Sequence, residues 1–290
     1  MLFVHLLKAM RPRQWTKNLV VFAALVFDRK LGLPEFYLPV LAGFGLLCML
    51  ASSIYLINDL ADIEQDRIHP TKRNRPIPSG RLPKNIAVVT ALALPVIALP
   101  LSFLMDFWFG VILSGYWLHN LAYSFKLKHV VIIDVMMIAL GFVLRVGSGV
   151  VLVDVKRFSP WLYVCVTLGA LFIGLGKRRH ELALLEDDAN SHRAVLDDYN
   201  LPLIDWMIAT VASSTIVAYS LYTFSAPDLP ANHTMMLTIP FVIYGIFRYL
   251  FLIHVKGKGG APDELIYKDG PLFITAVLWA WSAVLILYIF

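Results

Sequence analysis

The sequence consists largely of long apolar runs, which constrain the fold more than any other feature. A helix needs about 20 apolar residues to cross a bilayer, and within the hydrocarbon region the backbone satisfies its own hydrogen bonds only as a helix or a closed barrel. Charged residues make up only 16% of the 290 residues, whereas soluble domains contain about 25%. The sequence therefore predicts an all-α, polytopic membrane protein with nine transmembrane helices, expected at residues 15–33, 36–58, 83–104, 107–125, 130–153, 159–177, 204–224, 234–255 and 271–290.

The basic residues between these runs predict the orientation of the chain. With nine crossings, most lysines and arginines outside the runs fall on the side of the N-terminus, and only Arg29, Lys30, Lys156 and Arg157 fall on the other side. Basic loops are retained in the cytoplasm. We therefore expect a multi-pass protein of the inner (plasma) membrane, folded as one domain over residues 1–290, with the N-terminus in the cytoplasm and the C-terminus outside.

The long polar loops at 59–82, 178–203 and 256–270 then lie in the cytoplasm, where we expect the active site. The N-terminal segment is basic and lacks a small-residue cleavage site, so we expect no cleaved signal peptide. Cys48 and Cys165 lie in apolar runs and are interpreted as buried residues rather than a disulfide or metal pair. There is no Walker A loop and no G-x-S-x-G motif, and we expect no nucleic-acid partner.

An acidic stretch directly after the second run is the candidate catalytic site. Asn58 begins a segment with the spacing Asn-Asp-x-x-Asp-x-x-x-Asp. If the helix continues through it, Asp59, Asp62 and Asp66 lie on one face. Clustered carboxylates suit a hard cation, and Mg²⁺ is usual when the substrate brings phosphates. We therefore predict that these aspartates bind Mg²⁺; the alternative is a solvated acidic helix end beside a basic loop.

Groups of cations follow the acidic stretch and recur at the end of the sixth run. The first group is Lys72, Arg73 and Arg75, and the second is Lys177, Arg178 and Arg179, followed by Glu181. Such groups can bind phosphate, or they can anchor a helix end at the cytoplasmic face. Glu181 suggests a structured site, because a carboxylate there can hold an arginine in place or ligate a metal.

Ionisable residues inside the fifth run form a third set of candidates, since charge within a membrane span is costly and usually functional. Asp134 and Arg145 are eleven residues apart, about 16 Å along one helix, so each needs another partner. The alternative to a functional role is pairing with a neighbouring helix. Tyr123 and Lys128, at the end of the fourth run, join them as candidate binding residues, as does Lys17 at the start of the first.

The acidic motif is followed by Arg75-Pro76-Ile77-Pro78-Ser79-Gly80. Together with nine spans, these motifs resemble the UbiA superfamily of intramembrane prenyltransferases over essentially the whole chain. In that family the acidic motif binds Mg²⁺-diphosphate, and members acting on aromatic acceptors carry a second D-x-x-x-D after the sixth span. Here the segment from Lys177 to Glu181 stands at that place. This replacement, and the segment Arg11-Pro12-x-Gln14-Trp15-x-Lys17-Asn18, resemble the decaprenyl-phosphate phosphoribosyltransferase branch.

That branch joins 5-phosphoribosyl diphosphate (PRPP) to a polyprenyl phosphate lipid and releases diphosphate. The resemblance implies Mg²⁺ as cofactor, and a product, polyprenylphosphoryl-5-phosphoribose, used for cell-wall polysaccharide precursors. It implies that Asp59, Asp62 and Asp66 hold the metal and that Asn58 orients them. The other binding residues would be Lys17, Lys72, Arg75, Tyr123, Lys128, Asp134, Arg145, Lys177, Arg178, Arg179 and Glu181.

Two other functions stay open at this point. One is a UbiA-type prenyltransferase that moves a prenyl group from a prenyl diphosphate to an aromatic acceptor. The other is a lipid transporter or carrier, for which charge along a pathway to both membrane faces would be expected. The sequence leaves undecided the length and saturation of the isoprenoid, the downstream pathway, which cation binds which phosphate, and whether the protein forms a homo-oligomer.

Overall fold

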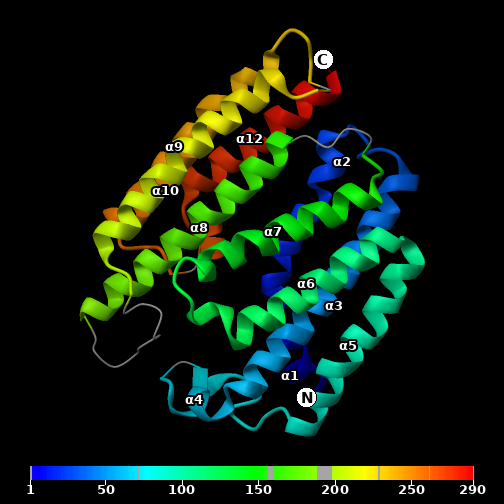
Figure 1. Ribbon diagram of the computed structural model, residues 1–290, viewed down its shortest axis with the longest axis vertical. Helices are drawn as coiled ribbons and strands as arrows, with labels where there is room; N and C mark the ends of the chain where they lie inside the picture. The colour runs from blue at the N-terminus through cyan, green and yellow to red at the C-terminus, as the bar shows by residue number, and fades with distance from the viewer. Residues whose placement is uncertain are drawn as a thin grey trace. The chain divides into compact units, whose positions relative to one another are not determined.

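The computed structural model describes residues 2–70, 72–155, 160–187, 198–227, 229–260 and 262–289. Every regular element in these ranges is helical, which confirms the all-α prediction (Figure 1). The α-helices are α1 (Leu2–Ala9), α2 (Ala23–Phe27), α3 (Pro34–Ala61), α4 (Ile63–Ile68), α5 (Lys84–Met105), α6 (Phe107–Phe125), α7 (Ile133–Leu152), α8 (Pro160–Asp187), α9 (Leu201–Ser225), α10 (Ile239–His254), α11 (Pro262–Lys268) and α12 (Gly270–Ile289). Short 3₁₀-helices are η1 (Pro12–Phe22), η2 (Lys72–Asn74), η3 (Leu127–His129) and η5 (Thr234–Thr238).

Seven helical segments of the described chain are long and apolar enough to cross a membrane. They are Pro34–Ala61, Lys84–Met105, Ile133–Leu152, Pro160–Leu184, Leu201–Ser225, Thr234–His254 and Gly270–Ile289. Each of these corresponds to an expected span. The expected spans at 107–125 and 15–33 are not among the seven. The segment 107–125 forms α6, in which His119 and Asn120 and several tryptophans and tyrosines stand among the aliphatic residues.

The stretch expected as the first span is helical but interrupted. It begins as the 3₁₀-helix η1, continues as the five-residue α2 and ends at Phe27. A 3₁₀-helix is rarely sustained over many residues, and the charged residues Asp28, Arg29 and Lys30 follow directly. Nine crossings therefore stay a prediction.

The chain forms two compact units. Unit 1 comprises Met1–Leu25, Lys30–Phe125 and Leu144–Val155, and unit 2 comprises Val26–Arg29, Lys126–Val143 and Lys156–Phe290. The helix α7 contributes its first half to unit 2 and its second half to unit 1. The expectation of one domain over residues 1–290 stays a prediction.

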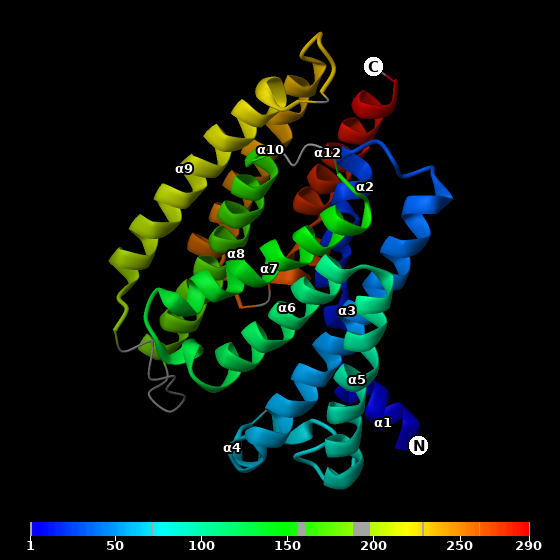
Figure 2. The ribbon, with the colours of Figure 1, turned by 45° about the vertical axis from the view of Figure 1, so that its right-hand side comes forward.

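Unit 1 is built around α3. In α3, 61% of an 18-residue apolar stretch is buried inside the protein, whereas the corresponding share is 28% to 44% in the other six candidate spans. The helices α3 and α5 lie side by side in both ribbon views (Figures 1 and 2), and η1 and α6 also pack against α3. Their shared core includes Leu47, Leu50, Phe109 and Leu113, all fully buried. This packing fixes the C-terminal end of α3, where the acidic stretch begins.

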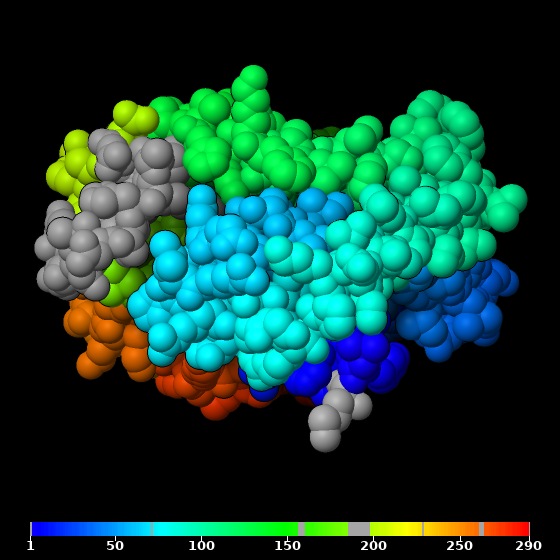
Figure 3. Space-filling view, turned by 90° about the horizontal axis from the view of Figure 1, so that it is seen from below, coloured from blue at the N-terminus to red at the C-terminus, as the bar shows by residue number. Residues whose placement is uncertain are grey.

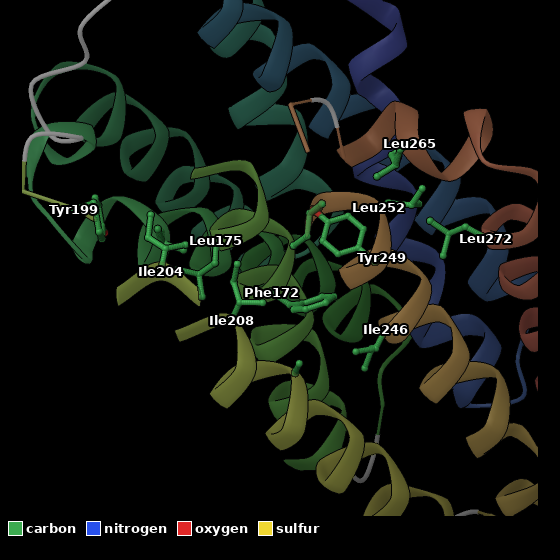
Figure 4. Packing of buried hydrophobic residues seen from close by; sticks show 13 residues of the cluster. Phe172, Leu175, Tyr199, Ile204, Ile208, Ile246, Tyr249, Leu252, Leu265 and Leu272 are labelled. Carbon is green, nitrogen blue, oxygen red and sulfur yellow. The ribbon is translucent and has the colours of Figure 1, made fainter. Parts of the chain in front are cut away.

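Unit 2 packs α8 against α9 and α10 against α12. The core between them contains Phe172 on α8 and Tyr249 on α10, with ring centroids 5.0 Å apart (Figure 4). Gly176 allows this close approach, because a Cβ atom there would lie 2.5 Å from the Tyr249 hydroxyl oxygen. The part of α8 around Gly176, where the basic segment begins, is thereby held against α10.

The outer faces of the long helices are apolar. On α5, Val89, Val96 and Leu104 are 66%, 71% and 81% exposed. A soluble monomer rarely leaves such a continuous apolar surface open, but a helix facing lipid requires it. These faces agree with a protein that lies in a membrane.

The close packing of α7 on η1 gives a test of the fold in unit 1. A Cβ atom at Gly149 would lie 2.0 Å from the Val21 carbonyl oxygen, whereas at Gly147 the nearest atom would be 4.0 Å away, on Ile112. We expect Gly149→Ala to destabilise the protein by about 1–3 kcal/mol, seen as a lower melting temperature in detergent, and Gly147→Ala to change it little. Equal melting temperatures for the two variants would contradict this packing.

Candidate active site

The acidic stretch lies where α3 ends. Asp59 belongs to the last turn of α3, and Asp66 belongs to the short helix α4. The helix does not continue between them, since Asp62 has φ −95° and ψ 12° and separates α3 from α4. The three aspartates would share one helical face only if the helix continued through them, and that condition is not met, because Asp62 separates α3 from α4.

Arg75 lies between the two buried carboxylates. Its Nη1 atom is 3.1 Å from Asp59 Oδ1 and 2.6 Å from Asp66 Oδ2. Asp59 and Asp66 are 1% and 2% exposed, and buried anions of this kind require charged or hydrogen-bonding partners. Lys72 Nζ adds positive charge at 3.8 Å from Asp66 Oδ1. The structure thus brings Asp59, Asp66, Lys72 and Arg75 together in unit 1.

A tight turn over residues 75–82 fixes the chain directly after Arg75. The Ser79 N–H donates to the Arg75 carbonyl at 3.0 Å, and the Leu82 N–H donates to the Pro76 carbonyl at 2.9 Å. Gly80 takes φ 75°, a conformation that glycine adopts without strain. Ile77 is buried beneath the turn. The segment between α3 and α5 is coloured cyan in Figure 3 and forms part of the molecular surface there.

Arg11 also contacts Asp59, and the sequence analysis did not name it as a site residue. Its guanidinium donates to Asp59 Oδ1 and lies 4.9 Å from the Tyr55 ring centroid. Arg11 has φ 55° and separates α1 from η1. Ser52 donates to the Met10 carbonyl and ties this turn to α3. The only sequence signal was a basic residue in the segment that resembles the phosphoribosyltransferase branch.

Arg145, predicted to need a partner other than Asp134, finds partners in unit 1. Its Nε donates to Asn18 Oδ1 and its Nη2 to the Tyr116 hydroxyl, both at 2.8 Å. Arg145 is 8% exposed and Asn18 only 1%. Lys17 is the neighbour of Asn18 in η1 and is half-buried. The buried arginine therefore fixes the segment that carries Lys17.

Asp134 is the centre of a buried network in unit 2. Its Oδ2 atom is 2.5 Å from Arg178 Nε, and its Oδ1 accepts the Tyr199 hydroxyl at 2.9 Å. The same hydroxyl accepts the Ile132 N–H at 2.6 Å. Asp134 and Arg178 are 0% and 1% exposed in their side chains. The predicted partner for Asp134 on another helix is thus Arg178 of α8.

Tyr199 was not predicted as a site residue. It follows residues 188–197, which lie outside the described residues, and the sequence around it is polar without a recognisable motif. Burial raises the pKa of the Tyr199 hydroxyl to about 12, so the tyrosine stays protonated and donates to Asp134 at neutral pH. Ile132, whose N–H it binds, has φ 69°, which is strained for a β-branched residue.

The basic segment of α8 is largely paired with carboxylates. Arg178 also donates to Glu181 Oε2, while Arg179 Nε is 2.6 Å from Asp205 Oδ1. The Arg178 and Arg179 side chains are 1% and 16% exposed, whereas Lys177 is 44% exposed and its Nζ lies 3.9 Å from Glu181 Oε1. Lys177 and Glu181 are therefore the members of this segment that a ligand reaches most easily.

The remaining predicted residues lie close to these groups in sequence. Asn58 precedes Asp59 in the last turn of α3 and is half-buried, and its carbonyl accepts the Asp62 N–H at 3.0 Å. Tyr123 lies in the last turns of α6 in unit 1, and Lys128 lies in η3 in unit 2; both are half-buried.

Asp59 and Asp66, here called the acidic pair, are the buried carboxylates that a divalent cation would use. Among the residues that the structure describes, no group of three His, Cys, Asp or Glu side chains is arranged to hold a metal. Asp59 and Asp66 nevertheless turn one oxygen each toward the same cationic atom, Arg75 Nη1. Carboxylate oxygens are the ligands that Mg²⁺ prefers. The donor set fits this ion, provided that Arg75 moves aside.

The sequence of the chain is similar to known proteins along nearly its whole length. Residues 19–266 match the UbiA prenyltransferase family. A decaprenyl-phosphate phosphoribosyltransferase from Mycolicibacterium smegmatis is 37% identical over 94% of this chain and 89% of that protein. Proteins of the same name from Corynebacterium glutamicum and Mycobacterium tuberculosis are 33% and 31% identical, covering 98% and 96% of this chain and 87% and 92% of those proteins.

The fold is also similar to solved structures. The structure of a UbiA homolog from Archaeoglobus fulgidus bound to GPP and Mg²⁺ has a TM-score of 0.72, with 18% sequence identity, over 98% of this chain and 99% of that chain. At this identity the likeness shows the fold alone. The resemblance inferred from the sequence motifs, and the expected class of a transferase with membrane-spanning helices, are confirmed by the sequence matches. The chain belongs to the UbiA prenyltransferase family.

Proposed function

We propose that this protein transfers the 5-phosphoribosyl group of PRPP to a polyprenyl phosphate and releases diphosphate. The observation that carries the proposal is the 37% identity, over 94% of the chain, to a protein named decaprenyl-phosphate phosphoribosyltransferase. The product would be polyprenylphosphoryl-5-phosphoribose, which supplies cell-wall polysaccharide synthesis. The composition of the α8 segment supports the same choice, since Lys177 and Glu181 stand where an aromatic prenyltransferase is expected to carry two aspartates.

The acidic pair is the proposed site of the diphosphate. Asp59 and Asp66, together with Asp62, would hold Mg²⁺, with Asn58 orienting Asp59. When bound, the ion neutralises the charge that develops on the departing diphosphate. Arg75 now occupies the point where the two buried carboxylates converge. Displaced from it, the guanidinium can form paired hydrogen bonds to phosphate oxygens, a geometry for which arginine is suited.

The other proposed binding residues surround phosphate groups. Lys177 is the exposed cation of the α8 segment, and we assign it to the ribose 5-phosphate or the lipid phosphate. Arg178 and Arg179 are held by carboxylates, so they support this segment from within. The remaining contacts to phosphate or ribose are assigned to Lys17, Lys72, Tyr123, Lys128, Asp134 and Arg145. Asp134 and Arg145 would act indirectly, because Asp134 holds Arg178 and Arg145 holds Asn18 in place.

The reaction needs little proton transfer. The C1–O bond of PRPP breaks and its electron pair leaves with the diphosphate, while a phosphate oxygen of the lipid forms the new bond to C1 from the opposite face. That oxygen is already anionic, so no strong general base is required. The residues of the chain therefore act mainly by positioning two anions and by reducing their repulsion.

We also propose that η1 with α2, and α6, complete nine crossings of the inner membrane in a single functional domain. The N-terminus would lie in the cytoplasm, the C-terminus outside, and the active site would face the cytoplasm. The basis is the concentration of lysine and arginine in alternate loops. PRPP and Mg²⁺ are then available from the cytoplasm, and the lipid from the bilayer.

A second candidate is prenyl transfer to a small acceptor. It is supported by the description of the matching family, which is that of prenyltransferases. Both reactions need an acidic site for a metal-bound diphosphate, so the acidic pair does not separate them. They differ in the donor that is consumed.

We expect label from PRPP to move into the organic phase when purified protein is given Mg²⁺, radiolabelled PRPP and a polyprenyl phosphate. Diphosphate should be released in equal amount, because each transfer breaks one C1–O bond. The matched reaction supplies a prenyl diphosphate and an aromatic acid. Prenylation of the aromatic acid, with no transfer from PRPP, would replace the proposed function by the second candidate.

We expect Asp66→Asn to lower turnover at least about a hundredfold, because the metal contribution to such a reaction is several kcal/mol. The control is Glu64→Gln, an exposed carboxylate of the same helix that pairs with Arg67, which should leave turnover near the wild-type value. Both variants should elute as folded protein from size exclusion. A fully active Asp66→Asn protein would remove Asp66 from the site.

A further inference from the structure

The C-terminal half of α8 presents a lysine and a glutamate on one face. Lys177 and Glu181 are four residues apart in the helix, so their side chains lie on the same face about one turn from each other. Their side chains are 44% and 26% exposed. Arg178 lies beneath them, 1% exposed. A ligand that reaches this part of unit 2 therefore meets one cation and one carboxylate together.

Glu181 is held in place from the interior. Arg178 donates to Glu181 Oε2 through Nη1 and to Asp134 Oδ2 through Nε, so one rigid guanidinium joins both carboxylates. Asp134 is fixed in turn by the hydroxyl of Tyr199. A carboxylate offers about four acceptor positions. Glu181 is thus a positioned carboxylate whose side chain is 26% exposed.

A positioned anion is an unusual neighbour for phosphate-binding cations. Phosphate oxygens are themselves anionic acceptors, so a carboxylate repels them. Where no metal ion lies between the two, a carboxylate favours a ligand through groups that donate hydrogen bonds, and the cations beside Glu181 are Lys177 and Arg178. Of the two substrates in the proposed function, the polyprenyl phosphate offers only acceptor oxygens at its head group. PRPP carries the 2′- and 3′-hydroxyls of ribose, and carboxylates commonly bind ribose hydroxyls.

We propose that Glu181 accepts hydrogen bonds from the ribose hydroxyls of PRPP and so selects this donor over a prenyl diphosphate, which has no hydroxyl. Lys177 beside it then meets a phosphate of the same molecule. Arg178, Asp134 and Tyr199 are positioning residues that hold the Glu181 carboxylate. This inference rests on the proposed function and assigns the specificity for its donor to one side chain.

The test compares PRPP with its 2′,3′-dideoxy analogue in the wild type and in Glu181→Ala. Hydrogen bonds from hydroxyls to a charged acceptor are strong. The wild type should therefore lose about ten- to a hundredfold in kcat/KM on the analogue. In Glu181→Ala the activity with PRPP should fall by a similar factor, and the penalty for the analogue should shrink to within about threefold, because the partner of the hydroxyls is absent. Glu35→Ala, an exposed glutamate at the start of α3, serves as control and should keep the full penalty.

Further measurements separate selection from a merely structural role. Calorimetric titrations without the lipid acceptor measure binding in the absence of turnover. In them the wild type should bind PRPP more tightly than the dideoxy analogue, and Glu181→Ala should bind the two with nearly equal affinity. Glu181→Asp should restore part of the discrimination, and Arg178→Lys should reduce it while the protein stays folded. An unchanged penalty for the analogue in Glu181→Ala would overturn the inference. A wild type that does not consume PRPP would instead overturn the proposed function.

Discussion

The cost of burying charge in an apolar protein governs this structure. Asp59, Asp66 and Asp134 are almost completely buried among helices whose outer faces are hydrophobic. An isolated buried carboxylate is costly by several kcal/mol, and the cost is offset only when cations and hydrogen bonds surround it. The positions of Arg75 and Arg178 follow from this requirement. Each guanidinium contacts two carboxylates, so it holds separate segments of the chain together while it compensates their charge.

The two units meet this requirement with different consequences. In unit 1, Arg75, Arg11 and Lys72 all contact the acidic pair, so cations are concentrated where a metal and a diphosphate are proposed to bind. In unit 2, Arg178 is enclosed by carboxylates and by the interior. Its charge is used to fix Glu181 rather than offered to a ligand. A basic sequence motif therefore produces a site that combines one exposed cation with one carboxylate.

The sequence predicted the helices well, because long apolar runs and membrane thickness leave few other folds. It identified Asp134 and Arg145 as residues that needed partners, from the cost of charge within a span. It did not identify Asn18, Tyr116 or Tyr199 as those partners. Neutral side chains carry no comparable signal, and their contacts join positions between 29 and 127 residues apart in the chain.

The sequence by itself determined the fold class, the membrane character, the family resemblance and the residues that carry charge, since each follows from local composition and spacing. The tertiary structure decided which charges face one another. It broke the helix at Asp62, set Arg75 between two aspartates and enclosed Arg178 while Glu181 stayed partly exposed. The reason is physical: exposure and pairing are set by the neighbours that packing brings from distant segments, and no local pattern of residues records them.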